Sequence, residues 1–384
     1  MTARSPLTDF RAQPLPPWRR AVLKVGSSLL AGFDDVAGLD ARHARALAGW
    51  LEAMHAAGRE VLLVTSGAVA AGRARCGAEG GGLLRRQALA ALGQAQLVGF
   101  WQGLLMVPVA QVLLSHDDLH DRRRYLNARA TLRELLQLRA LPLINENDTV
   151  ATEELKLGDN DNLAAAVAAL VDADLLLIAS DIGGLYDADP TQAAAARAIA
   201  RVDAVTPALL AACGAAGRIG TGGMRSKLEA AAKAADGGIA SALFCGRDAA
   251  VLAALAQDRL HGTLIAAAAD ALPARKQWLR HAPALGRVHV DAGAAEALRA
   301  RGASLLPGGV HAVEGRFHRG DVVEVLLQGE AARALARGLA QYGSDELQRI
   351  AGHRSGEIET LLGFRYGEAV IHRDDLVLLP AGVP

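Results

Sequence analysis

At roughly 150 residues per domain, the 384 residues predict one large and one smaller domain and exclude a single small module. Apolar residues make up 51% of the chain and charged residues 21%, which excludes an unfolded protein and is enough for a buried core. The 41 basic and 41 acidic residues cancel, so no overall charge draws the protein to nucleic acid or to an anionic membrane.

The first segment, residues 1–18, contains prolines and arginines but no apolar core of a signal peptide, and we expect a disordered lead-in. The three cysteines are far apart and form no CxxC pair, which favours a reducing, cytoplasmic location. The longest apolar stretch, 162–180, carries Asp172 and Asp174 near its middle, so we predict no membrane-spanning segment.

From residue 20 to residue 258, short β-rich apolar runs alternate with segments of helical periodicity, the pattern of an α/β fold with a mostly parallel sheet. The expected strands begin at Ala21, Val61, Val107, Leu141, Asp174 and Ile239. The expected sheet-covering helices lie within 39–58, 83–105 and 161–173. Because ligands of such sheets bind beyond the carboxyl ends of the strands, those ends are where we expect the chemistry.

Around residues 261–283 this alternation lapses, with two prolines and no clear strand, and we place a linker there. From residue 284 onward the chain contains short strand candidates bounded by glycine, the last of them at 368–379, and two helix candidates. This pattern predicts a small β-rich domain, followed by a C-terminal tail at 371–384.

The sharpest motif is GTGGMRSK at residues 220–227, which runs into a segment of helical periodicity. Glycines let the backbone approach a ligand closely, and the first N–H groups of a helix attract anions. Lys227 would add a positive charge beside a nucleotide phosphate. The alternative is an ordinary helix start in a chain with 41 glycines. Neither GxxxxGK[ST] nor a GxGxxG after the first strand occurs, which excludes those two nucleotide-binding loops.

Two earlier strand ends carry weaker signals. The first strand leads into Lys24 and a tight turn at 26–28, which is either a second phosphate contact or a lysine whose stem lies along apolar surface. The second strand ends at 65–68, where amides and hydroxyls would hold a carboxylate or simply cap a turn.

Lysine is rare in this chain, since only five of the 41 basic residues are lysines. They are Lys24, Lys156, Lys227, Lys233 and Lys276. Where arginine serves as the general surface cation, the remaining lysines are enriched at positions that need a compact ammonium group.

Polar side chains also gather at strand ends. Residues 145–148 follow one strand, residues 158–162 precede a helix, and Asp181 ends another strand. Solvated turns and helix caps explain each of them alone, but a shared polar pocket at one sheet edge explains them together.

His116 and His120 have the spacing of a helical zinc pair, but no third ligand or general-base glutamate accompanies them, so we discount a zinc site. The remaining lysines, glycines, hydroxyls, amides and carboxylates suit phosphoryl transfer to an acceptor that is already an anion. Such an acceptor needs positioning and charge neutralisation, and no base.

Taken in order, six segments resemble the glutamate 5-kinase family of amino acid kinases. They are AVLKVGSSLL (21–30), VTSGAVAAG (64–72), INENDTV (144–150), LKLGDNDNLAA (155–165), SDIGGLYDADP (180–190) and GTGGMRSKLEAA (220–231). The resemblance implies an amino acid kinase domain over 19–260, folded as a three-layer α/β sandwich. It also implies ATP-dependent phosphorylation of the L-glutamate γ-carboxylate, the first step of proline synthesis.

The resemblance further implies roles for single residues. Lys24 and Lys227 would neutralise the transferring phosphoryl group, and Asp161 would orient both lysines. Ser66, Asp148 and Asn160 would hold glutamate. The residues that would hold ATP are Lys24, Ser180, Asp181, Thr221, Gly222, Gly223, Met224, Arg225, Ser226 and Lys227. Mg²⁺ would be bound mainly through the ATP phosphates, without a metal site of the protein's own. A γ-carboxylate with a pKa near 4.3 is ionised at pH 7, so no general base is required.

Residues 284–370 resemble the PUA domain found in bacterial members of the family, and PUA domains elsewhere bind RNA. From residue 284 onward, eleven arginines and no lysine stand against thirteen acidic residues, a net charge of −2, so we do not expect RNA as a partner. The resemblance also implies feedback inhibition by proline and a homo-oligomer, either a dimer or a tetramer.

Two alternatives stay open. One is a kinase of the same fold with another acceptor, such as N-acetylglutamate, aspartate, carbamate or a nucleoside monophosphate. Asp148 argues against a purely anionic acceptor, because a carboxylate suits a free α-ammonium group. The other alternative is an RNA-binding protein with an inert kinase domain, and the joint presence of Lys24, Asp161 and Lys227 argues against it.

Overall fold

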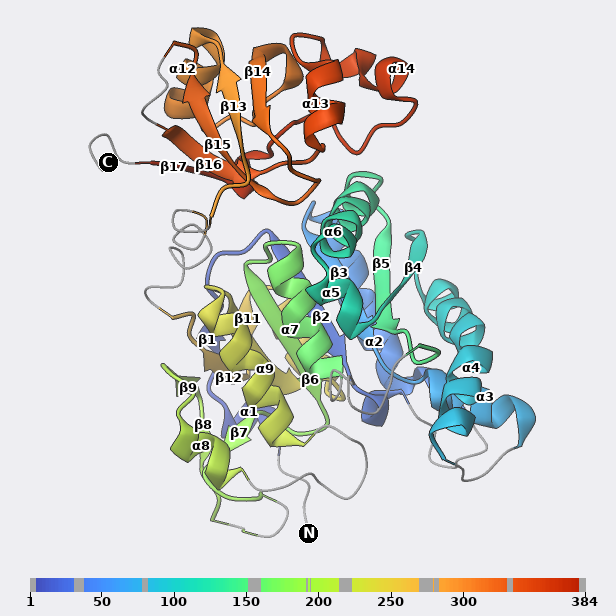
Figure 1. Ribbon diagram of the computed structural model, residues 1–384. Helices are drawn as coiled ribbons and strands as arrows, with labels where there is room; N and C mark the ends of the chain where they lie inside the picture. The colour runs from blue at the N-terminus through green and yellow to red at the C-terminus, as the bar shows by residue number, and fades with distance from the viewer. Residues whose placement is uncertain are drawn as a thin grey trace. The chain divides into compact units, whose positions relative to one another are not determined.

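The computed structural model of the 384-residue chain describes residues 5–30, 38–77, 82–150, 160–190, 193, 195–213, 223–268, 279, 283–329 and 334–379. The chain divides into two compact units, Met1–Ala271 and Leu272–Pro384 (Figure 1). Each unit has its own sheet and its own apolar core.

The larger unit is built on an eight-stranded sheet in the order β4-β5-β3-β2-β6-β10-β12-β9. Its strands are β2 (Arg20–Val25), β3 (Glu60–Thr65), β4 (Val109–Leu114), β5 (Leu141–Glu146), β6 (Leu175–Ser180), β9 (Arg201–Val202), β10 (Ala240–Cys245) and β12 (Gly262–Ile265). From β4 to β10 all neighbours pair in parallel, whereas β12 runs antiparallel to β10. The predicted, mostly parallel sheet is confirmed.

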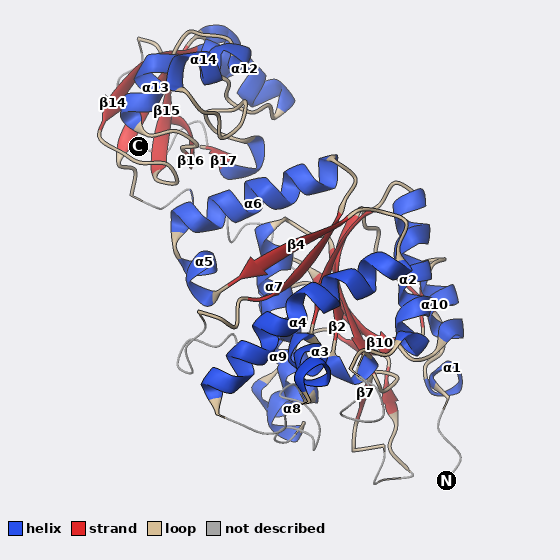
Figure 2. Ribbon diagram, turned by 90° about the vertical axis from the view of Figure 1, so that its right-hand side faces the viewer, coloured by secondary structure: helices blue, strands red, loops and turns tan. Residues whose placement is uncertain are grey.

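Helices cover both faces of this sheet and make three layers (Figure 2). One face is covered by α2 (Ala41–Ala56), α4 (Leu83–Leu104) and α10 (Ala249–Leu255), and the other by α6 (Arg122–Gln137), α7 (Asn160–Leu170) and α9 (Met224–Asp236). Side chains alternate between the faces along each strand. Leu23 and Leu63 join the first core, whereas Val22 and Leu62 join the second.

Smaller elements complete the larger unit. The short helices are α1 (Pro6–Asp9), η1 (Ser27–Leu29), α3 (Ala68–Cys76), α5 (His116–His120) and α8 (Pro207–Ala212). The short strands are β1 (Gln13–Pro14), β7 (Leu185–Tyr186), β8 (Ala198–Ile199) and β11 (Arg259–Leu260). The side chains of His116 and His120, the pair considered above for zinc, lie outside what the structure describes.

The smaller unit is a five-stranded sheet with helices packed on it. Its strands, in sheet order, are β14 (Val310–Gly315), β13 (Gly286–Val290), β15 (Val322–Leu327), β16 (Ala334–Leu339) and β17 (Leu376–Leu378). Its helical segments are α12 (Ala292–Arg301), η3 (Pro307–Gly309), α13 (Ser344–Ile350), η4 (Ser355–Glu357), α14 (Ile358–Leu362) and η5 (Arg373–Asp375). The predicted β-rich character of this part is confirmed.

The expected disordered lead-in is wrong for the described residues from 5 onward. Phe10, Leu15 and Trp18 are buried, and β1 pairs with β11. The ring of Phe10 lies so close to Gly183 and Gly184 that a Cβ on either glycine would come within 2.8 Å of it. The segment is fixed because its few apolar side chains fill gaps in the larger unit, although its local composition is polar.

Two other boundaries need correction. The expected linker at 261–283 begins with β12, which pairs with β10 inside the main sheet, so the larger unit extends beyond residue 260. The expected tail at 371–384 contains β17, which pairs with β16, and buried Ile371 and Val377. β12 is too short to produce a clear alternation in the sequence, and pairing with distant strands defines it. β17 lies inside the strand candidate at 368–379, which the expected boundary at 371 divided.

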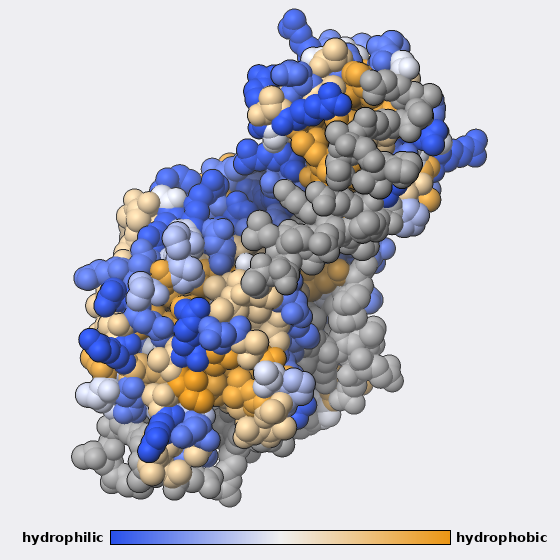
Figure 3. Space-filling model, turned by 90° about the vertical axis from the view of Figure 1, so that its left-hand side faces the viewer, coloured by the Kyte–Doolittle hydropathy of each residue, from blue (hydrophilic) through white to orange (hydrophobic). Residues whose placement is uncertain are grey.

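Hydrophilic residues border the apolar area near the middle of the larger unit on the face drawn in Figure 3. Within the described part of the chain, no helix is long and apolar enough to cross a membrane.

Candidate active site

The parallel strands β2, β3, β6 and β10 end level with one another. Val25 pairs with Thr65 and with Ala179, and Cys245 pairs with Ser180. This carboxyl edge is where the fold class places its ligands. The predicted site residues that the structure describes lie at or just beyond the ends of these strands and of β5, or in the first turns of α7 and α9.

Three charged side chains meet in the interior at this edge. Asp161, in the first turn of α7, is fully buried, and both lysines beside it are less than a tenth exposed. Lys24 Nζ, from β2, lies 2.5 Å from Asp161 Oδ1, and Lys227 Nζ, from the first turn of α9, lies 3.3 Å from Asp161 Oδ2. The structure therefore brings together the triad that the sequence predicted.

The carboxylate of Asp161 is ionised in spite of its burial. Burial by itself raises the pKa of Asp161, but the positive charges of Lys24 and Lys227 and hydrogen bonds from Lys24 and Ser226 hold that pKa below its ordinary value. Ser226 Oγ donates to Asp161 Oδ2 at 3.0 Å. One buried carboxylate thus fixes two ammonium groups that come from different elements of the fold.

A second cluster, directly beside this triad, is centred on Asn160. Its Nδ2 donates to Ser66 Oγ at 2.7 Å, to the carbonyl oxygen of Thr65 at 3.0 Å and to Asn145 Oδ1 at 3.0 Å. Asn160 and Ser66, two of the three residues expected to hold glutamate, are thus joined by a hydrogen bond. The turn into α3 depends on Gly67, whose φ of +117° is one that residues with a side chain rarely adopt.

Asp148, the third predicted glutamate residue, lies in the turn that follows β5 and is half-buried. It therefore lies at the same carboxyl edge as the Asn160 cluster.

The predicted ATP residues form two groups. Ser180 ends β6 and is buried, and its Oγ donates to Asp181 Oδ1 at 3.3 Å. The other group opens α9, which begins at Met224 after Gly223, an N-cap residue without a side chain to cap the first N–H groups. A helix start of this kind attracts phosphate. Arg225 pairs with Glu229 at 2.9 Å along the helix surface. Thr221 and Gly222 lie outside the described residues.

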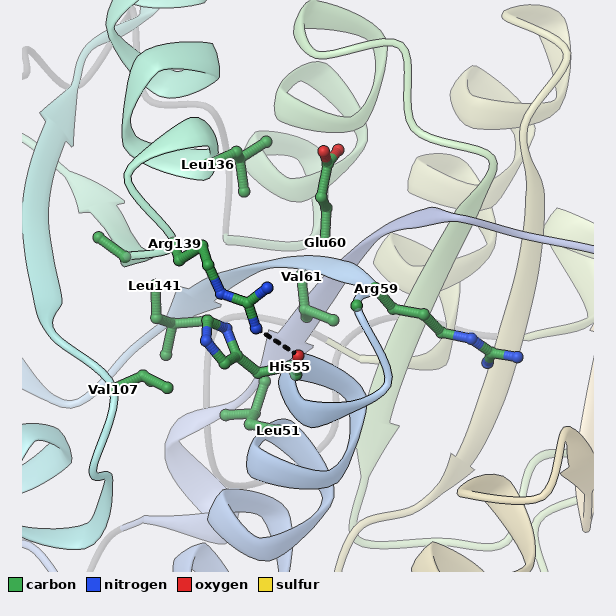
Figure 4. A pocket seen from close by; sticks show the side chains of 11 residues that line it. Leu51, His55, Arg59, Glu60, Val61, Val107, Leu136, Arg139 and Leu141 are labelled. Carbon is green, nitrogen blue, oxygen red and sulfur yellow. Dashed lines mark hydrogen bonds between the residues drawn. The ribbon is translucent and has the colours of Figure 1, made fainter.

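A separate cavity of about 130 Å³ lies at the opposite edge of the sheet (Figure 4). It is formed near the ends of α2 and α6 and the starts of β3 and β5, where Arg139 Nη2 donates to the carbonyl oxygen of His55 at 3.0 Å. None of the predicted site residues lines it, so we do not assign the chemistry to this cavity.

The described residues include no group of three or more histidine, cysteine, aspartate or glutamate side chains that could hold a metal ion. The candidate site is therefore built from ammonium groups, one buried carboxylate, amides and hydroxyls.

Two residues at the carboxyl edge of the sheet were not assigned to the site from the sequence. Asn145 is buried and accepts a hydrogen bond from Asn160, and Arg247, in the turn after β10, donates to the carbonyl oxygen of Ser28 at 3.2 Å. The polar run at 145–148 was a signal for Asn145. Arg247 is one arginine among 36 and has no local signal.

Comparisons with known proteins show the family to which the chain belongs. Residues 19–245 match the amino acid kinase family, and residues 286–362 match the PUA domain. A glutamate 5-kinase of Xylella fastidiosa (strain M23) is 56% identical over 386 residues, which cover 99% of this chain and 100% of the relative. A glutamate 5-kinase of Xanthomonas oryzae pv. oryzae (strain KACC10331 / KXO85) is 61% identical over 364 residues, 93% of this chain and 100% of the relative.

Among solved structures, an isopentenyl phosphate kinase aligns with a TM-score of 0.45 at 17% identity, covering 64% of this chain and 99% of that one. The resemblance noted in the sequence is confirmed by the family matches and by the two curated relatives. This chain belongs to the amino acid kinase family, within its glutamate 5-kinase branch, and carries a C-terminal PUA domain.

Proposed function

We propose that this protein transfers the γ-phosphoryl group of ATP to the γ-carboxylate of L-glutamate, giving γ-glutamyl phosphate and ADP, the first step of proline synthesis. The observation that carries the proposal is the buried Lys24–Asp161–Lys227 triad beside the Asn160–Ser66 cluster at one sheet edge. The full-length relatives named above support the choice of glutamate as acceptor.

The reaction needs charge neutralisation more than proton transfer. A γ-carboxylate oxygen bonds to the γ-phosphorus while the bond from that phosphorus to the ADP oxygen breaks, and no proton moves at pH 7. Lys24 and Lys227 neutralise charge on the moving phosphoryl group. Asp161 keeps the two ammonium groups in place before the substrates arrive, so little reorganisation is required during the reaction.

Glutamate is held by the second cluster in this proposal. Asn160 and Ser66 contact the substrate, and Asn145 orients the Asn160 amide through its hydrogen bond. Asp148 pairs with the α-ammonium group of glutamate, which excludes acceptors that lack a free ammonium group.

ATP is held by Ser180 and Asp181 on one side and by residues 221–227, including the first N–H groups of α9, on the other. Mg²⁺ would be held mainly through the ATP phosphates at this site and would supply further charge neutralisation there.

The test is an acceptor panel with ATP, Mg²⁺ and hydroxylamine, which converts an acyl phosphate to a coloured hydroxamate. L-Glutamate should give hydroxamate, and N-acetylglutamate should not, because Asp148 repels an acceptor without an ammonium group. Equal yields from both acceptors would contradict the proposal.

Asp148→Asn tests the binding role in the same assay. We expect weaker glutamate binding by about 1.5–3 kcal/mol, the scale of a lost charge-assisted hydrogen bond. Asp203→Asn is the matched control, because Asp203 is 81% exposed and pairs only with nearby Arg201 among the contacts described. An unchanged glutamate KM in Asp148→Asn would remove this residue from the site.

Membership of this family also suggests how the enzyme is regulated and assembled. We propose that proline inhibits the enzyme, that the protein forms a dimer or a tetramer, and that it works in the cytoplasm, where its three unpaired cysteines remain reduced. Activity that is indifferent to millimolar proline would contradict the first of these expectations.

A further inference from the structure

Arg247 joins two loops of the candidate nucleotide site. It lies in the turn that follows β10, and its Nη2 donates to the carbonyl oxygen of Ser28, in the turn after β2, at 3.2 Å. The same Nη2 lies 3.8 Å from Asp181 Oδ2, just beyond β6. One guanidinium group therefore connects the loop after Lys24 with the loop that carries Asp181.

The backbone brings Arg247 to this place through Gly246. The Gly246 N–H donates to the carbonyl oxygen of Ser180 at 2.8 Å. A Cβ on Gly246 would lie 2.7 Å from Leu29 Cδ1 and 3.0 Å from Ala179 Cβ, so any larger residue would push the turn away from β6 and η1. Asp248 then caps α10 by accepting from the Ala250 N–H at 2.9 Å. The turn is thus fixed on both sides of Arg247.

The contact with Asp181 contributes little to folding. The side chains of Arg247 and Asp181 are 44% and 46% exposed, and half-exposed pairs at this separation are weak. The Arg247 guanidinium has a larger effect on the binding of an anion such as ATP. A carboxylate repels the phosphates of ATP, and a neighbouring guanidinium offsets that repulsion. Lys24 and Lys227 are both directed to Asp161, whereas Arg247 faces Asp181.

We infer that Arg247 is a positioning residue of the nucleotide site, which holds the loops after β2 and β6 together and offsets the charge of Asp181 toward the phosphates of ATP. This inference rests on the proposed function, because it takes Asp181 and its neighbours as the ATP site. It assigns a role in ATP affinity to a residue that contacts neither the phosphoryl-transfer triad nor the Asn160 cluster through any bond described.

Three substitutions test the inference in the full-length protein. Arg247→Ala should raise the KM for ATP roughly fivefold to tenfold, with kcat and the glutamate KM within about twofold of wild type. Arg247→Lys keeps the charge and should restore most of the ATP affinity. Arg247→Gln keeps polarity without charge and should behave as Arg247→Ala does.

Two further measurements, at high salt and with a second substitution, distinguish an electrostatic role of Arg247 from a purely structural one. Between about 0.1 M and about 1 M salt the screening length falls from about 10 Å to about 3 Å, so the difference between wild type and Arg247→Ala should shrink. Asp181→Asn removes the repelling charge itself, so adding it to Arg247→Ala should bring the ATP KM back toward that of wild type.

Arg201→Ala is the matched control. Arg201 also pairs with an exposed aspartate, Asp203, at 2.7 Å, but it lies on β9 at the far end of the sheet order, so its kinetics should equal those of wild type. An unchanged ATP KM in Arg247→Ala would overturn the inference. So would a failure of Asp181→Asn to improve ATP binding by Arg247→Ala, or a parallel loss of kcat and glutamate affinity with a lower melting temperature.

Direct ATP binding, measured by calorimetry without glutamate, separates this inference from the proposed function. A wild-type protein that binds ATP but forms no glutamyl hydroxamate would contradict the choice of acceptor. The comparison of ATP Kd between wild type and Arg247→Ala would still decide the role of Arg247, with a weaker Kd supporting it and an equal Kd overturning it.

Discussion

Lys24 and Lys227 approach opposite oxygens of one buried carboxylate, and both are among the five lysines of an arginine-rich chain. A compact ammonium group can follow the phosphoryl group as it moves, whereas a planar guanidinium is wider and has a fixed fork of donors. All three side chains are less than a tenth exposed.

We therefore expect Lys24→Arg and Lys227→Arg each to lower kcat by roughly 10²–10³ with little effect on folding, the scale for losing one preorganised electrostatic contact. Lys233→Arg is the control, because Lys233 lies on the same helix but is exposed, with its Nζ 2.7 Å from Asn162 Oδ1. Steady-state kinetics check the three variants. Equal activity in all of them would show that the chain's bias against lysine has no bearing on catalysis.

Asp161 also makes a pH-dependent contribution to stability. Because its pKa is lower in the folded protein than in the unfolded chain, the stabilisation is present above about pH 4 and is lost as the pH falls through the folded-state pKa. Asp161→Asn should cost about 3–5 kcal/mol at pH 7, since two buried lysines lose their counter-charge. Urea unfolding at a series of pH values should show this difference shrinking below about pH 4. A difference that stays constant down to pH 3 would contradict the account.

At the scale of elements, the sequence predicts well the strands and helices that have a regular local pattern of apolar residues. The six long strands and the helices α2, α4 and α7 were recognisable because apolar residues recur at spacings that belong to one strand or one helix. By contrast, β1 and β12 have two and four residues and exist through pairing with β11 and β10, which no local pattern encodes.

The residues of the candidate site also differ in whether the sequence alone could identify them. The residues in glycine-rich and polar motifs were found from the sequence, and Arg247 was not, because only the fold brings its turn to Asp181.

The N-terminal segment, expected to be a disordered lead-in, packs against the loop that follows Asp181. Substitutions in this segment test how much that packing stabilises the protein. Phe10 is fully buried against Gly183 and Gly184, a few residues after Asp181, and its ring meets Tyr186 edge-on at 5.2 Å. Phe10→Ala should destabilise the protein by about 3–5 kcal/mol. Leu7→Ala, in the same segment but 37% exposed, should cost less than about 1 kcal/mol. Thermal or denaturant unfolding measures both, and equal small effects would mean that the segment is dispensable.

At the scale of the whole molecule, every described residue of the candidate site belongs to the unit Met1–Ala271. The second unit has a separate core around Val288, Val325 and Ile371. We therefore expect the first unit to catalyse the reaction without the second.

A chain that ends near Ala282 should keep glutamate-dependent ADP formation within about twofold of the full chain, because no described site residue is removed and the core of the larger unit is complete. Coupled assay of ADP release, with circular dichroism as the check on folding, measures this. Loss of ATP binding in a truncated chain that is still folded would show that the C-terminal unit completes the site.

The pairing of β1 with β11 sets an order of events during synthesis. Residues 13 and 14 leave the ribosome about 245 residues before their partners at 259 and 260, an interval of roughly 10–50 s at 5–20 residues per second. During that interval residues 13 and 14 lack their strand partners, and until residues 183–186 have been made Phe10 lacks the two glycines and the Tyr186 ring against which it packs. Since Phe10 lies against Gly183 and Gly184, the loop beside Asp181 acquires its support only when these elements have emerged. A growing chain therefore completes the candidate nucleotide site late, after nearly all of its larger unit has been made.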